Sequence, residues 1–174
     1  MPAPLILIVG AGGLGAMWLL AKAKAGSTSG GTMLSKNISE ADFTVSSWAA
    51  KNGVSNSLPS DKVEAAKRTA AFLERYWDAA GGFTITSGYR NDTVNAGVGG
   101  SSTSDHMSAE SVDVTPKGIT AKSFAQMLYD EKPADLDQCI YYTDKGHVHI
   151  GLGGTRGEYM TSSDGGFTSV TAYV

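Results

Sequence analysis

All three histidines of this chain lie in two short segments, residues 104–113 and 146–150. His106 and Asp113 belong to the first segment, and His147 and His149 alternate with apolar residues in the second. Neutral imidazole and carboxylate groups are ligands that suit Zn²⁺. His106, Asp113 and His149 can therefore fill three positions of a tetrahedral zinc site. The fourth position would stay open for water, which is the arrangement of a catalytic site rather than a structural one.

His147 is expected to lie beside the same site. The segment from His147 to Ile150 alternates as a half-buried strand does, and side chains two positions apart on a strand share a face. His147 then has two open roles: a second metal ligand, or an acid/base group that hydrogen-bonds the transition state. The competing interpretation is a surface strand with two solvated histidines and an unrelated His106.

Short helices and strands are expected to position these segments. Apolar residues at helical spacing, with capping residues and glycine stops, predict helices at 39–43, 46–53, 60–80 and 120–129 and one that begins at 91. Alternating apolar residues predict strands at 83–87, 112–114, 138–142 and 147–152. The remaining residues, 153–174, are rich in Gly, Ser and aromatics and are expected to hold one more hairpin.

The amino-acid composition indicates which kinds of molecule the protein is not expected to bind. The 174 residues include 14 basic and 17 acidic side chains, for a net charge of −3, and no basic run occurs. Nucleic acid is therefore not expected as a partner. Cys139 is the single cysteine and cannot form an internal disulfide, so we expect it to be a small buried residue.

The first residues predict a membrane anchor. Residues 4–21 form a run of 18 residues without a charge, followed by Lys22 and Lys24, which is at the short end of what spans a bilayer. Small residues four positions apart, such as Ala11 and Gly15, permit helix–helix association in the membrane. A cleaved signal peptide is the alternative, but no Lys or Arg precedes the apolar run. The positive-inside rule would place the two lysines in the cytoplasm, and orientation stays open.

Three parts of the chain are expected from this pattern: an anchor at 1–25, a flexible Gly/Ser/Thr linker at 26–37, and a folded domain at 38–174. A dinucleotide-binding fingerprint also occurs at 10–15, as GAGGLG. That motif needs a second strand ending in an acidic residue about 20 residues further on. Linker composition follows instead, which favours the membrane segment over the nucleotide-binding interpretation.

The segment SGYRNDTVNAGVGGSSTSDHMSAESVDV, with GHVHIGL downstream, resembles the zinc D-Ala-D-Ala carboxypeptidases. That family includes D-Ala-D-Ala dipeptidases and phage L-Ala-D-Glu endolysins. The resemblance covers residues 40–152, and the family motif SxHxxGxAxD is met at Ser104, His106 and Asp113. It departs at Ala109 and Ser111, where the family has Gly and Ala. The resemblance implies the Hedgehog/DD-peptidase fold, an α+β domain with a small antiparallel sheet flanked by helices.

The resemblance also implies site roles. Zinc would be held by His106, Asp113 and His149. Arg90 would lie over the site, where its guanidinium suits a substrate carboxylate or a developing oxyanion. Ser101 and Ser104 would hydrogen-bond the substrate or Asp113, and the alternative is that they are ordinary loop residues.

The catalytic base is less well defined by the motif. Relatives commonly place an acid a few residues before the last zinc-binding histidine, often three, where this chain has Gly146. The nearest acid is Asp144, while some relatives use a histidine two positions before the ligand, which is His147 here. We expect Asp144 as base and His147 as the residue that contacts the transition state.

The expected function is a membrane-anchored zinc peptidase that cuts peptidoglycan stem peptides. The bond would be a D-Ala-D-Ala terminus, a cross-link or an L-Ala-D-amino acid bond. A phage virion or lysis enzyme fits this organisation, and a bacterial envelope enzyme fits it too. The alternative, from a different class, is a cell-wall-binding or structural virion module that keeps the fold but has lost turnover.

Overall fold

The computed structural model of the protein describes residues 31–173. The predicted anchor and the first part of the predicted linker, residues 1–30, lie outside this range. None of the helices within residues 31–173 combines the length and apolar character needed to cross a bilayer.

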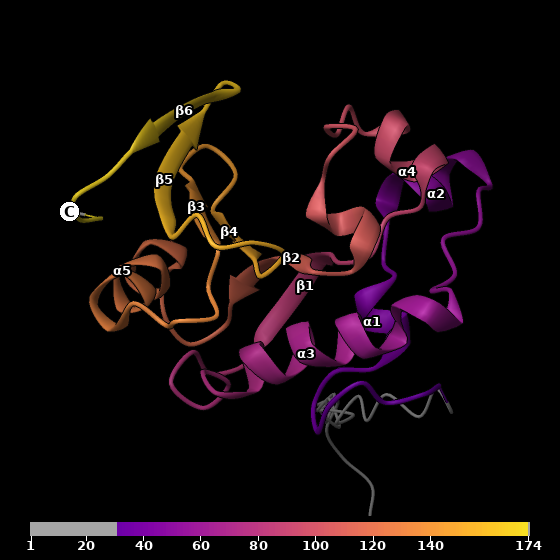
Figure 1. Ribbon diagram of the computed structural model, residues 1–174, viewed down its shortest axis with the longest axis horizontal. Helices are drawn as coiled ribbons and strands as arrows, with labels where there is room; N and C mark the ends of the chain where they lie inside the picture. Colours follow the sequence, from indigo (N-terminus) through magenta and orange to yellow (C-terminus); the bar gives the residue numbers. More distant parts are fainter. Residues whose placement is uncertain (1–30, 174) are drawn as a thin grey trace, which may run out of the picture.

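The described chain alternates short helices with the strands of one sheet (Figure 1). The α-helices are α1 (Glu40–Phe43), α2 (Ser47–Asn52), α3 (Val63–Glu74), α4 (Asp92–Gly97) and α5 (Ala121–Glu131), and two 3₁₀ turns are η1 (Ser60–Lys62) and η2 (Asp105–Ser108). The strands are β1 (Phe83–Ser87), β2 (Ser111–Pro116), β3 (Gln138–Tyr142), β4 (His147–Gly151), β5 (Glu158–Ser163) and β6 (Gly166–Ser169). The α+β class expected from the sequence is confirmed.

Packed structure begins before Ile38, within the stretch predicted as linker. Leu34 is buried, and a β-bridge joins Met33 to Ser39. The Glu74 carboxylate, at the end of α3, accepts a hydrogen bond from the Ser35 hydroxyl at 2.7 Å and two more from Asn37. Residues 33–37 are therefore part of the folded domain.

The predicted helix at 60–80 is shorter than expected. Regular α-helix ends at Glu74, and the amides of Arg75, Tyr76 and Trp77 donate to carbonyls three residues back. The last turns are therefore wound more tightly than an α-helix. They carry Tyr76 into the core, where its ring lies 5.8 Å from that of Phe124 on α5.

The sheet has six strands in the order β1-β2-β4-β3-β5-β6. Every neighbouring pair is antiparallel except β3 and β5, which run parallel, so the expectation of a wholly antiparallel sheet is wrong. The reason lies in the connection at residues 152–157. Strand β4 ends beside the start of β3, and this short connection crosses that end of β3 before β5 begins, which forces β5 to run in the direction of β3.

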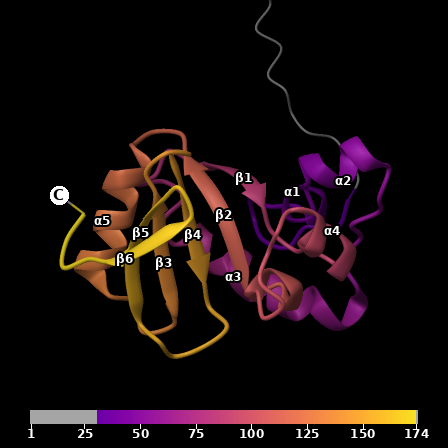
Figure 2. The same cartoon turned by 90° about the horizontal axis from the view of Figure 1, so that it is seen from above.

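One face of the sheet forms the core, and α3 and α5 cover it (Figures 1 and 2). Alternation along the strands turns Val112, Val114, Val148 and Ile150 toward this core, where each is fully buried. Residues between these valines and isoleucine, including Asp113 and His149, point to the opposite face. The hydrophobic face thus fixes the direction of the polar residues that form the site.

Candidate metal centre

His106 is held in one orientation by the turn that carries it. Its side chain is 3% exposed, and its Nδ1 lies 2.6 Å from the carbonyl oxygen of Gly88. A carbonyl oxygen only accepts, so Nδ1 carries the proton and Nε2 presents a lone pair. Nε2 lies 3.4 Å from the Asp113 Oδ1. The orientation is that of a metal-binding histidine whose second nitrogen is hydrogen-bonded to the protein.

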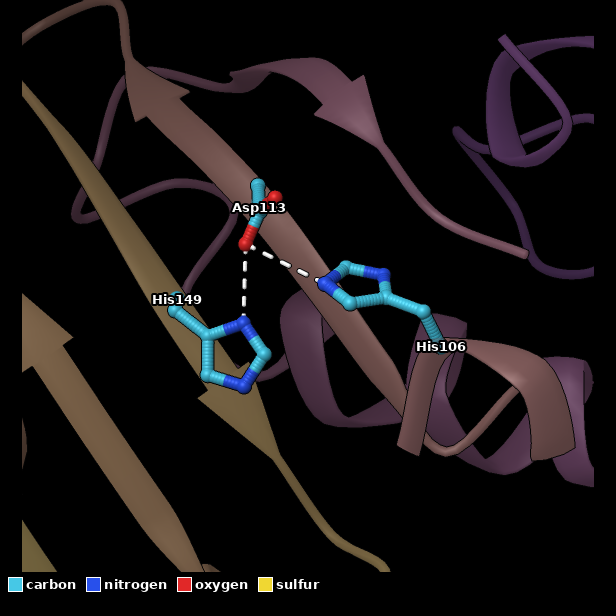
Figure 3. Close-up of side chains that lie close together, drawn as sticks. All are labelled: His106, Asp113 and His149. Atoms are coloured by element: carbon cyan, nitrogen blue, oxygen red, sulfur yellow. Dashed lines mark hydrogen bonds and ion pairs between the residues drawn. The ribbon is translucent and has the colours of Figure 1, made fainter. Parts of the chain in front are cut away.

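Asp113 and His149 face each other across neighbouring strands. They are register partners in β2 and β4, and the His149 Nδ1 lies 2.8 Å from the same Oδ1 that faces His106 (Figure 3). The two imidazole rings have centroids 5.1 Å apart. The predicted triad is therefore brought together from three elements, η2, β2 and β4, around one carboxylate oxygen.

The second oxygen of Asp113 is held by Arg90. The Arg90 Nη2 donates to Oδ2 at 2.8 Å, and its Nε donates to the Ser87 hydroxyl at 2.7 Å. Arg90 and Asp113 are both largely buried, with side chains 16% and 12% exposed. The guanidinium therefore fixes the carboxylate and leaves Oδ1 directed at the histidines.

The donor set fits a zinc ion. Tetrahedral zinc with bonds of about 2.0–2.1 Å places its ligand atoms about 3.3 Å apart. The separation of 3.4 Å between His106 and Asp113 already has this value. The 2.8 Å between His149 and Asp113 is a hydrogen-bond distance and must widen by about 0.5 Å when a metal replaces the proton. Two imidazoles and one carboxylate also match the ligand types that zinc accepts.

Protonation of the triad favours metal binding at neutral pH. Burial lowers the pKa of His106 below its ordinary value, so the ring is neutral. Burial alone would raise the pKa of Asp113, but electrostatic attraction and hydrogen bonds from His106 and His149 outweigh it and hold the pKa well below its usual range. Asp113 and His106 are thus in the protonation states that a metal requires, a carboxylate and a neutral ring.

The triad opens into a cleft of about 710 Å³. The predicted site residues that line it are Arg90, Ser101, Ser104, His106, Asp113, His147 and His149. Asp144 is not among the lining residues and lies exposed in the turn between β3 and β4. The structure therefore brings together every predicted site residue except the expected base.

His147 lies in the cleft as a half-buried ring. It stacks on Tyr142, with ring centroids 4.6 Å apart and planes inclined by 29°. Burial lowers its pKa below the ordinary histidine value, so the ring is neutral at pH 7 and able to accept a proton.

The two motif departures have structural consequences. Ala109 ends η2 with φ at 63°, a left-handed conformation that glycine adopts without steric cost and alanine does not. The Ser111 hydroxyl is fully buried and has no hydrogen-bond partner among the described residues. Both positions lie between the ligands His106 and Asp113, and the chain still delivers both ligands.

Sequence analysis missed a set of charged residues beside the ligands. The fully buried Asp137 carboxylate accepts from the Arg156 Nε at 2.7 Å and also from the amide and Nη2 of Arg156. The Nη2 also donates at 2.9 Å to Asp105, the residue before His106. No spacing rule links Arg156 to Asp137, which lies 19 residues before it, or to Asp105, which lies 51 residues before it. The one indication in the sequence was Arg156 itself, a basic residue that follows the histidine-containing segment 146–150.

Comparison with known proteins agrees with this geometry. The family model described as peptidase M15 matches residues 36–151, a range that contains all three residues of the triad. No curated protein matches the chain.

Proposed function

This chain belongs to the peptidase M15 family, and on that premise we propose that it is a zinc peptidase that hydrolyses peptide bonds of peptidoglycan. The proposal rests on one observation above others. Three ligand-type side chains from separate elements meet around the Asp113 Oδ1, at the wall of a cleft that is open to a peptide. A buried structural zinc would need a fourth protein ligand, and none of the described residues completes the group.

We assign the metal to His106, Asp113 and His149. Zinc there would supply a Lewis acid for the scissile carbonyl and lower the pKa of its water. Arg90 holds Asp113 through Nη2, and its Nη1 makes no hydrogen bond within residues 31–173. That nitrogen is therefore the donor we assign to a substrate oxygen.

His147 is the residue we assign to proton transfer. It is a neutral ring in the cleft wall, two positions from His149 on the same face of β4. A neutral imidazole accepts a proton from the attacking water and returns it to the leaving amine. The exposed position of Asp144 favours His147 over Asp144 for this role. Ser101 and Ser104, which also line the cleft, are assigned to hydrogen bonds with the substrate.

Zinc content and peptidoglycan hydrolysis, measured together, test the proposal. The purified wild-type protein should hold one zinc per chain and release new amine groups from purified peptidoglycan. His106→Ala should lose both zinc and activity, whereas His147→Gln should keep zinc and lose most activity. Wild-type protein without zinc would refute the metal assignment. Full activity of His147→Gln would refute the proton-transfer assignment.

A second candidate function is favoured by the position of Asp144. With that acid outside the cleft and Gly146 where relatives carry an acid, the domain would bind the cell wall without turnover. The same experiment separates the two functions. Zinc-loaded protein that retains peptidoglycan fragments and releases no amine would establish the binding module.

We extend the proposal to the bond that the enzyme cuts and to the place where the enzyme is located. We propose cleavage at a D-Ala-D-Ala, cross-link or L-Ala-D-Glu bond, by an enzyme of a phage virion, of phage lysis or of the bacterial envelope. Residues 4–21 would anchor it in a membrane, and residues 26–32 would link this anchor to the catalytic domain. The support is the uncharged run in the sequence. Recovery of the intact chain in the soluble fraction after lysis would contradict the anchor.

A further inference from the structure

A second row of side chains crosses the sheet beside the metal ligands. His147 pairs with Tyr142, Tyr142 with Ser162, and Ser162 with Phe167, across β4, β3, β5 and β6. Paired residues share a face, and His147 is two positions from His149, so the row lies on the face that carries the ligands. All four residues of the row line the cleft. Figure 2 shows the four strands side by side.

The row is aromatic along most of its length. The Tyr142 ring stacks on His147 and meets the Phe167 ring edge-on, at 6.5 Å and 79°. Phe167 is 58% exposed, the most exposed large hydrophobic side chain among the described residues. An exposed aromatic ring inside a cleft provides apolar area for a ligand to cover.

One cleft cation has no carboxylate partner among residues 31–173. Arg90 and Arg156 are paired with Asp113 and Asp137, but Lys145 forms no ion pair within that range. The Lys145 Nζ instead lies over the Tyr142 ring, 5.1 Å from its centroid. Lys145 is therefore available to an anionic group of a ligand that lies along the row.

The length of the row suits a peptide of several residues. From β4 to β6 it crosses three gaps between strands of about 4.8 Å each, or about 14 Å in total. An extended chain rises about 3.3 Å per residue, so about four residues fit along this length. The outer half of the row belongs to β5 and β6, which lie beyond the family match at 36–151.

We propose that this row and Lys145 form a binding platform for an extended acidic peptide, on one side of the bond cut at the metal centre. This inference rests on the proposed function. It names the part of the substrate that the platform selects. Tyr142 and Phe167 cover aliphatic parts of the peptide, and Lys145 pairs with a side carboxylate such as that of a D-Glu residue.

Two ligands that differ in one charge test the platform. The full-length, zinc-loaded protein is titrated calorimetrically with a synthetic stem tetrapeptide whose D-Glu carboxylate is either free or amidated. Amine release is followed in parallel. Lys145→Gln is compared with Lys132→Gln, because Lys132 makes the same contact with Tyr129, at 5.1 Å, outside the cleft. Phe167→Ala is compared with Thr168→Ala, its exposed neighbour on β6.

We expect amidation to weaken binding about fivefold in wild type and Lys132→Gln, and to have no effect in Lys145→Gln. Phe167→Ala should weaken binding of both peptides about tenfold, and Thr168→Ala should not. If Lys145→Gln keeps the wild-type preference, or Phe167→Ala binds like Thr168→Ala, the platform is refuted. Binding in the expected pattern without amine release would support the platform and refute the peptidase. If amine is released but Lys145→Gln and Phe167→Ala bind the two peptides as wild type does, the peptidase is supported and the platform is refuted.

Discussion

Arg156→Met should reveal how much the fold depends on one buried ion pair. Arg156 is the sole cation bonded to Asp137 among the described residues, and the Asp137 side chain is 0% exposed. Burial alone would raise the pKa of Asp137, but hydrogen bonds and charge from Arg156 outweigh it and lower that pKa. Removal of the guanidinium would leave a carboxylate buried without a counterion.

The size of the loss follows from this burial. Removal of one partner of a buried pair costs about 3–5 kcal/mol of unfolding free energy. The Arg156 side chain is 45% exposed, so water reaches part of the pair and the lower value, about 3 kcal/mol, applies. In a domain of this size that loss lowers Tm by about 9 °C.

Thermal and urea unfolding of the zinc-free protein measure the loss, with Arg68→Met as control. The Arg68–Glu110 pair at 3.2 Å is more exposed, with side chains 65% and 32% exposed, so its loss should cost less than about 1 kcal/mol. The double variant Arg156→Met/Asp137→Asn should be more stable than Arg156→Met, because it removes the unpaired charge as well.

A pH series gives an independent check. In Arg156→Met the unpaired carboxyl of Asp137 has a raised pKa, so it gains a proton in the folded state as pH falls from 7 toward 4. The deficit relative to wild type should therefore shrink across that range. A deficit that does not change with pH, or a double variant less stable than Arg156→Met, would refute the explanation by an unpaired buried charge.

Three further predictions concern the ligand segment. The zinc-free protein should lose stability as pH falls below about 6.5, since His106 and His147 are neutral when folded and protonate on unfolding, and should lose more below about 4 as Asp113 protonates. In a series of thermal melts, His106→Gln should shrink the first step, and the double variant His106→Gln/His147→Gln should remove it. Ala109→Gly should raise stability by up to about 1 kcal/mol in urea titration, because glycine relieves the left-handed strain. Ser111→Ala should be neutral or stabilising by about 1 kcal/mol in the same titration, because it removes a buried hydroxyl without a partner; a loss above about 1 kcal/mol would show that the hydroxyl is bonded.

Residues close together in the sequence were enough to predict helix ends and one strand of this structure. Gly53 ends α2 in a left-handed conformation, and the Asn91 side chain caps α4, as their positions in the sequence indicated. The alternation around His147 and His149 predicted β4 and its polar face. These features depend on residues within a few positions of one another, so a single sequence is enough to find them.

Features that depend on distant contacts were not predictable in the same way. The parallel pairing of β5 depends on where the connection at 152–157 crosses β3, and composition does not encode that crossing. The exposed position of Asp144 follows from the tight turn that joins β3 to β4, with Gly146 at φ 66°. The pair of Arg156 with Asp137 exists only because the same crossing brings both beside η2.

The origin of the ligands from η2, β2 and β4 also has a kinetic consequence. Strands β3 and β4 can form their hairpin locally, but Asp113 meets His149 only when that hairpin docks on β2, past the whole of α5. Because pairing across a long stretch of sequence forms slowly, we expect the metal contacts to be completed late in folding, after the rate-limiting step. A ligand that binds only the closed arrangement slows unfolding and leaves the folding rate nearly unchanged. Zinc would then lengthen the lifetime of the folded domain, so resistance to proteases would track zinc supply more closely than the yield of refolding does.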